Sequence, residues 1–352
     1  AGSDAGAVSV RTLDATATTG PDETIEFTAG AQLAGGIDID AAGDVRQDGG
    51  NTRLRLERLA ADTPYGDTRL AGPTTITVTG GVARTEALTL LVEGGRIALS
   101  GSAGADRLDL DARLTALPLS IANAFRPDLG AGGTLSGTLD VTGTAQAPRV
   151  GFDLNADAVT AAPLRQAGVT PFAVSAEGSF ADDRLRLASV SASNPQGLDL
   201  NASGTVPLSG AGLDVDLSGS APLALAEAAL AGRGTQLGGT ARFEGRATGA
   251  IAAPSLSGLI SVSGGTILDP GANIELTGVN LLAGLEGDRL VIRNGSASVT
   301  GGGGVSLSGQ IGLAPPFVAD LSLELAGARY TDGRMVTADL GADLAITGPL
   351  TG

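Results

Sequence analysis

The feature that most constrains this chain is the alternation of apolar and polar residues along short segments. Apolar side chains occupy every second position in LDLDARL from Leu108, in RLRLAS from Arg184 and in GVSLSG from Gly304. Because successive side chains of a β-strand point to opposite faces, each segment predicts a strand with one apolar and one polar face. Gly-Gly, Asp-Gly and Asn-Pro dipeptides lie between the segments and predict turns.

Strand and turn alternate about every ten residues, which is typical of an antiparallel meander and predicts about 30 strands. We therefore expect an all-β fold that is elongated and mainly antiparallel. A short helix is predicted only over residues 221–232, where Pro222 suits the first turn and Gly232 the C-terminal cap. Residues 118–125 are a weaker helix candidate.

The sequence also repeats itself at a spacing of about 105 residues. Residues 132–148 return as residues 238–254 with seven of 17 positions identical, and residues 183–208 return as residues 288–313 with ten of 26 identical. Such units contact mainly their neighbours along the chain. We expect a diverged β repeat over residues 1–131, further repeats over 132–237 and 238–345, and the start of another over 346–352.

Composition excludes several classes of function. The chain of 352 residues carries a net charge of −16, and its 22 basic residues, all Arg, are scattered among 38 acidic ones, which argues against nucleic-acid binding. His, Cys and Lys do not occur, so a Ser-His-Asp or Ser-Lys arrangement and a thiolate site are impossible. We expect no enzyme activity, no catalytic residue and no cofactor.

Two motifs remain that could carry chemistry. The pairs Asp38/Asp40, Asp109/Asp111 and Asp214/Asp216 point the same way from a strand and could serve hydrolysis or hold a hard cation. We favour the simpler interpretation, that they hydrate the outer face of a half-buried sheet, and expect no metal site. Gly301–Gly304 could cradle a phosphate, but a strand rather than a helix follows and Lys is absent, so a flexible turn is expected.

The aliphatic faces of the predicted strands allow two interpretations. They could form the core of a two-sheet sandwich, or they could line a trough that holds lipid chains; periodicity alone does not separate these. We expect the side chains named next to share the inner face, with Asp109, Asp111, Asp199, Asp214 and Asp216 outside. The candidate lining residues are Leu108, Leu110, Val141, Phe152, Leu154, Leu185, Leu187, Leu198, Leu200, Val206, Val215, Leu217, Ile260, Val262, Leu290, Ile292, Val305, Leu307, Ile311, Leu321 and Leu323.

Three stretches of the chain resemble the TamB family of Gram-negative envelope proteins, which belongs with the AsmA-like proteins. They are residues 69–150, beginning RLAGPTTITVTGG, residues 265–298, beginning GTILDPGANIELTG, and residues 327–350, beginning GARYTDGRMVTADLG. Each stretch is low in complexity, and the resemblance lies in their shared order and spacing. It implies an internal segment of the periplasmic part of such a protein.

The resemblance implies a fold and a function. TamB-like proteins cross the periplasm as a sheet curled into a U-shaped, taco-like groove with an apolar interior. They bridge the inner and outer membranes for phospholipid transport and for the assembly of outer-membrane proteins and autotransporters. The implied partners are phospholipid acyl chains in the groove and an Omp85-type barrel resembling TamA. We expect the inner-membrane anchor and the barrel contact to lie in parts of the parent outside this segment.

Two other classes compete with this interpretation. A surface-exposed β-helix stalk or adhesin would have a structural role, but such stalks tend toward short coils and polar ladders. A carboxylate enzyme on a β-helix, such as a polysaccharide lyase, would be expected to use aromatic residues and Lys to grip its substrate. Aromatic residues are only 3% of this chain.

Overall fold

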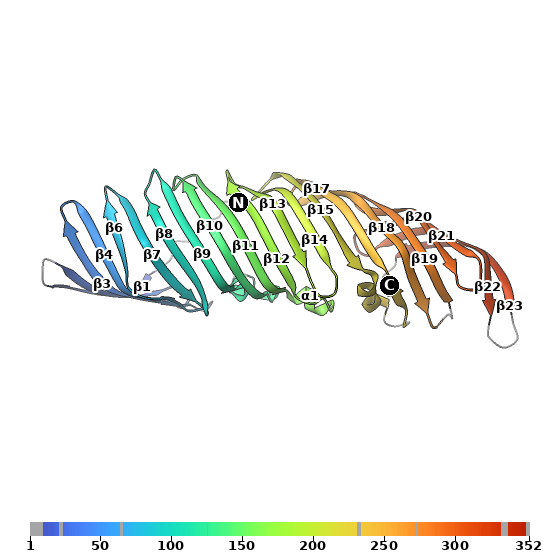
Figure 1. Ribbon diagram of the computed structural model, residues 1–352, viewed down its shortest axis with the longest axis horizontal. Helices are drawn as coiled ribbons and strands as arrows, with labels where there is room; N and C mark the ends of the chain where they lie inside the picture. The colour runs from blue at the N-terminus through green and yellow to red at the C-terminus, as the bar shows by residue number, and fades with distance from the viewer. Residues whose placement is uncertain are drawn as a thin grey trace. The chain divides into compact units, whose positions relative to one another are not determined.

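The chain folds almost entirely into antiparallel β-strands (Figure 1). The computed structural model describes residues 10–20, 24–63, 66–124, 126–230, 234–271, 274–331 and 337–349. It is 75% strand and 5% helix, with one large antiparallel sheet of 23 strands among the described residues. The predicted all-β, mainly antiparallel class is confirmed. The expected number of about 30 strands is wrong because many strands are longer than assumed, up to the 17 residues of β18.

The chain divides into two compact units, each described here by itself. The first comprises Ala1–Pro163 and Pro171–Asp183, and the second Leu164–Thr170 and Arg184–Gly352. This division does not coincide with the repeat boundaries expected after residues 131, 237 and 345.

The first unit, blue to green in Figure 1, is a meander in which each long strand pairs with the next long strand of the chain. Its strands are β1 (Val10–Thr19), β2 (Ile25–Leu33), β3 (Ile37–Asp48), β4 (Asn51–Asp62), β5 (Thr68–Leu70), β6 (Thr74–Thr79), β7 (Val82–Val92), β8 (Gly95–Ala103), β9 (Leu108–Pro118), β10 (Gly132–Gly143), β11 (Pro148–Thr160) and β12 (Phe172–Ala181).

The second unit, yellow-green to red, repeats this meander. Its strands are β13 (Arg184–Ser193), β14 (Asp199–Pro207), β15 (Ala211–Pro222), β16 (Gln236–Gly238), β17 (Thr240–Ala250), β18 (Ala253–Asp269), β19 (Ile274–Glu286), β20 (Arg289–Val299), β21 (Gly304–Gly312), β22 (Val318–Thr331) and β23 (Thr337–Pro349).

Each unit contains one short strand beside a long one. The short β5 and the longer β6 both pair with β4 and with β7, so together they occupy one strand position in the sheet of the first unit. In the second unit, β16 and β17 both pair with β18.

Helical segments are short and lie at strand ends. The helix expected near residues 221–232 is a 3-10 helix, η4 (Leu223–Leu230), and residues 231–233 lie outside the described part of the chain. The weaker candidate over residues 118–125 is the 3-10 helix η2 (Leu119–Ala124), with residue 125 also outside. A 3-10 turn, η3 (Pro127–Leu129), and a five-residue α-helix, α1 (Ala162–Gln166), were not predicted.

Very little of the chain is fully buried. Among the described residues, ten hydrophobic side chains and that of Thr74 are buried, and no large side chain is completely enclosed. The chain of 34.4 kDa keeps 20854 Å² accessible to solvent. Two globular domains of half that mass would together expose only about 15,600 Å². The two units are therefore thin sheets, with far less enclosed core than globular domains of their size.

Candidate functional site: the apolar sheet faces

The apolar side chains of the first unit form continuous rows across neighbouring strands. In an antiparallel ladder, residues directly opposite each other point to the same face. Leu110 of β9 lies opposite Val141 of β10, which lies opposite Val150 of β11, and Val150 lies opposite Phe180 of β12. This row and its three neighbours across β8–β12 contain only Ala, Gly, Val, Leu, Ile, Phe and Pro. We call this side of each unit its apolar face.

The second unit has the same arrangement. Leu187 of β13 lies opposite Gly204 of β14, which lies opposite Val215 of β15. Farther along, Ile292 of β20 lies opposite Gly309 of β21, which lies opposite Leu321 of β22. The apolar face therefore extends from strand to strand within each unit.

These apolar side chains are mostly half-buried. Among the candidate lining residues, Val215, Val262 and Ile292 are buried, at 6–7% exposure, whereas Leu217 is 37% exposed. The other candidates have intermediate exposure. Side chains on the central strands of a sheet are half-buried when they are shielded by their neighbours on the same face and are not covered by a second layer. In the described part of the chain, all strands belong to this one sheet and no second sheet is formed.

The structure places 20 of the 21 candidates in strands. Leu198 is the exception, because it lies in the turn before β14, where its backbone N–H donates to Asn194 Oδ1 at 3.0 Å. Leu217 is in β15, but its opposite neighbours are Ala202 and Gly245, which are too small to cover it.

The candidate set omitted residues that belong to the same rows. Ile97 lies opposite Leu114, Leu139 lies opposite Phe152, and Phe243 lies opposite Ile260. The alternation in RIALSG (residues 96–101) and LDLDARL (residues 108–114) gave the signal for Ile97, Leu99 and Leu114. We therefore add Ile97, Leu99, Leu114, Leu139 and Phe243 to the apolar faces.

The opposite side of each unit, its polar face, carries the carboxylates. Asp109, Asp111, Asp199, Asp214 and Asp216 are all exposed and alternate with the apolar residues, as expected from the sequence. Asp38 and Asp40 are exposed in β3 in the same way. In the described residues, no group of three or more Asp or Glu side chains is arranged to hold a metal ion.

Cross-strand charges on the polar face differ between the units. Arg246 Nε and Nη2 donate to the two Asp214 oxygens at 2.7 and 2.8 Å, and Arg246 Nη1 lies 3.6 Å from Asp216. This hydrogen bonding and the charge of Arg246 lower the pKa of Asp214. In the first unit, Asp111 lies directly opposite Asp140, and a hydrogen bond between the two carboxyl groups is the main cause of a raised pKa of Asp111.

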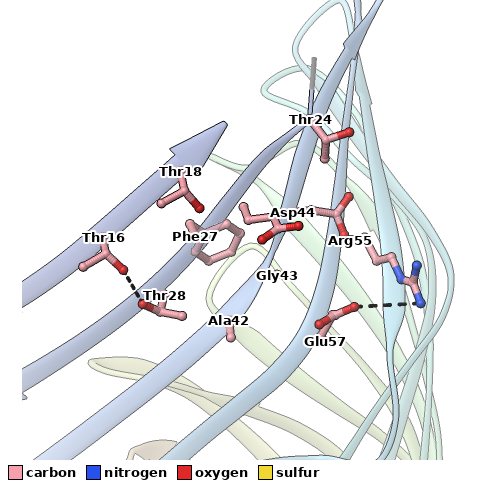
Figure 2. A pocket seen from close by; sticks show the side chains of 11 residues that line it. Thr16, Thr18, Thr24, Phe27, Thr28, Ala42, Gly43, Asp44, Arg55 and Glu57 are labelled. Carbon is pink, nitrogen blue, oxygen red and sulfur yellow. Dashed lines mark hydrogen bonds and ion pairs between the residues drawn. The ribbon is translucent and has the colours of Figure 1, made fainter. Parts of the chain in front are cut away.

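Shallow hollows also occur on the polar face. Figure 2 shows one of about 390 Å³ in the first unit, lined by hydroxyl and charged side chains of β1 to β4. Thr16 and Thr28 are joined by a hydrogen bond of 2.6 Å, and Arg55 lies 3.9 Å from Glu57. These contacts are typical of a solvated sheet surface, and they do not bring together a nucleophile and a base.

The segment Gly301–Gly304 has the geometry of a turn leading into β21. The Val299 N–H donates to the Gly303 carbonyl, and the Gly302 N–H donates to the Val299 carbonyl. A strand follows directly, as expected for a turn and unlike a phosphate-binding loop.

Comparisons of the chain with models of protein families, with characterised proteins and with solved structures give no match. None of the helices in the described ranges is long and apolar enough to cross a membrane.

Proposed function

We propose that this chain is part of the periplasmic shaft of a TamB-like protein, and that its apolar faces form the inside of a U-shaped groove for phospholipid acyl chains. In this proposal the parent protein is anchored in the inner membrane and bridges to the outer membrane. It also supports the assembly of outer-membrane proteins and autotransporters, together with an Omp85-type barrel. The segment itself contributes no catalysis.

The observation that carries the proposal is an uncharged apolar face whose side chains are mostly only half-buried. A soluble protein rarely exposes a contiguous apolar patch of more than a few hundred Å² unless the patch binds something. Acyl chains require apolar surface and no polar partner, which matches rows made only of aliphatic, aromatic and small residues. A sandwich core would instead enclose its large side chains.

Recurring structural irregularities support the proposed repeat of about 105 residues. A register shift between Leu187 and Val190 recurs between Ile292 and Gly295, 105 residues later. The shift between Ala156 and Val159 recurs between Val262 and Gly265, 106 residues later. The 3-10 helices η2 and η4, which follow β9 and β15, begin 104 residues apart. Bulges of this kind bend and twist a strand, so their recurrence favours a sheet that curls regularly.

The antiparallel pairing argues against the alternative of a β-helix stalk. Parallel β-helices stack short parallel coils, whereas the strands of the described residues form one antiparallel sheet. The same pairing argues against a carboxylate enzyme built on a β-helix.

Native mass spectrometry of gently purified protein tests the proposal. We expect masses higher than that of the polypeptide by one or more phospholipids, which collisional activation would remove. Lipid-free protein from a membrane-containing preparation, with no uptake from added vesicles, would count against the lipid groove and favour a purely structural role.

A further inference from the structure

Two corresponding places of the repeat carry opposite charge arrangements on the polar face. Asp111 of β9 and Asp216 of β15 are 105 residues apart, and each lies directly opposite a charged residue of the neighbouring strand. The partner of Asp111 is Asp140, a like charge, whereas the partner of Asp216 is Arg246. Like charges placed directly opposite destabilise an antiparallel pair, and opposite charges stabilise it.

We call the set of backbone hydrogen bonds between two neighbouring strands a seam. We propose that, because of these pairs, acid stabilises the β9–β10 seam of the first unit and destabilises the β15–β17 seam of the second. The proposal concerns the polar face and does not depend on the lipid groove.

The geometry of the first seam explains its response to acid. When both carboxyl groups are ionised they repel across the ladder. When they share one proton they can form a hydrogen bond, which joins the two strands. The pKa of Asp111 is raised from its ordinary value of 3.8, first by the hydrogen bond with Asp140 and then by desolvation and by the charges of Asp140 and Asp109. A raised folded-state pKa means that the stabilisation is present at low pH and is lost as the pH rises through that pKa.

Other charged groups border the Asp111–Asp140 pair on the polar face. The opposite positions of β8 and β11 are the uncharged Ser100 and Gly151. The remaining charged neighbours, along β9 and on β7 and β11, are Glu86, Asp109, Arg113, Arg149 and Asp153. This mixture of both signs does not replace the missing cation directly opposite Asp111.

The second seam responds in the opposite direction. Arg246 lowers the pKa of Asp214 through its hydrogen bonds, against a smaller raising effect of desolvation. A lowered folded-state pKa means that stabilisation is present above the unfolded pKa and is lost as the pH falls. Acid therefore favours the first seam and disfavours the second.

Hydrogen–deuterium exchange of the full chain tests the proposal. Protection factors, corrected for intrinsic exchange, are measured at about pH 7 and about pH 4, and β3–β4 peptides serve as the reference for the general loss of net negative charge. Relative to them, we expect protection of β9–β10 peptides to rise roughly two- to five-fold on acidification, and that of β15–β17 peptides to fall by a similar factor.

Exchanging the charges provides the matched controls. Asp140→Arg should remove the acid-dependent rise at β9–β10, and Arg246→Asp should create such a rise at β15–β17. Asp140→Asn, which adds no charge, should raise β9–β10 protection at about pH 7 and flatten its pH dependence. An acid-dependent rise that persists in Asp140→Asn and Asp140→Arg, or no rise in the unchanged protein, would overturn the proposal.

Discussion

Gly204, in the middle of β14, has a φ of +139°, a conformation that residues with a side chain rarely adopt. A Cβ atom at this position would collide with the Asp214 carbonyl oxygen of β15. Gly309, 105 residues later, has a φ of +130° and faces the Asp320 carbonyl oxygen in the same way. The two glycines therefore permit a close approach of neighbouring backbones at two places 105 residues apart.

We expect Gly204→Ala to lower the free energy of unfolding by about 1–3 kcal/mol, because the strained φ and the collision act together. The measurement is the midpoint of urea unfolding, followed by circular dichroism. Gly304→Ala is the matched control, since its nearest contact is 3.5 Å and its φ is ordinary. Equal midpoints for the two variants would contradict the argument.

The Arg246–Asp214 pair gives a second prediction at this scale. Because hydrogen bonds from Arg246 lower the pKa of Asp214, Arg246→Gln should move that pKa back up toward the ordinary value of 3.8. Titration of the Asp214 carboxyl carbon by NMR measures this directly. Arg289→Gln, on the same unit but bonded to Asp288 and Gln310, should leave the Asp214 titration unchanged.

At the scale of strands, the period-two pattern was sufficient to predict the fold class and the alternation of side chains between two faces. LDLDARL predicts Leu108 and Leu110 on one side of the sheet and Asp109 and Asp111 on the other. The pairing of β9 with β10 agrees with this prediction. The pattern did not predict the register shifts. A shift arises where an extra residue of one strand is left unpaired against the neighbouring strand, and a local pattern does not contain that pairing. The sequence does contain a sign of one: in RLRLASVSAS the apolar positions slip from Leu187 to Val190, where the bulge occurs.

Other features depended on contacts that no local pattern contains. The exposure of Leu217 follows from small residues on two neighbouring strands, one of them almost 30 residues away. The segment LALAEAAL is short and mostly apolar, and it forms a 3-10 helix that contacts β16, where Glu227 Oε1 accepts from the Leu237 N–H at 2.7 Å. Helix-forming composition therefore predicted the place of this segment but not its type.

Two substitutions on strands separate an open face from a packed core. Leu307 is half-buried on the apolar face, so Leu307→Asp should lower stability by only about 1–2 kcal/mol, since the carboxylate can reach water. Ala283, between Ile260 and Ile292, is completely buried, so Ala283→Asp should cost several kcal/mol and prevent folding of this region. Soluble yield and circular dichroism measure both effects, and unfolding by Leu307→Asp would indicate a packed core.

At the scale of the whole molecule, the large accessible area has a calorimetric consequence. An unfolded chain of this mass exposes about 50,000 Å², so folding removes only about 58% of that area from water, compared with about 69% for two globular domains of half that mass. Because the heat-capacity change of unfolding scales with the apolar area exposed, we expect it to lie about a sixth below the value for two such globular domains. Differential scanning calorimetry measures this quantity, and a value as large as that of two such domains would contradict the picture of thin, sparsely enclosed units.

The proposal that the apolar faces hold acyl chains is tested most directly by site-specific photocrosslinking of the protein in cells. A photoreactive amino acid is placed at Leu307, on the apolar face of β21, or at Ser306, its neighbour on the polar face. The two positions are adjacent in the same strand, and their side chains point to opposite faces. We expect phospholipid adducts, detected by mass spectrometry, at position 307 and at most a trace at position 306. Equal labelling at both positions, or no phospholipid at position 307, would contradict the account.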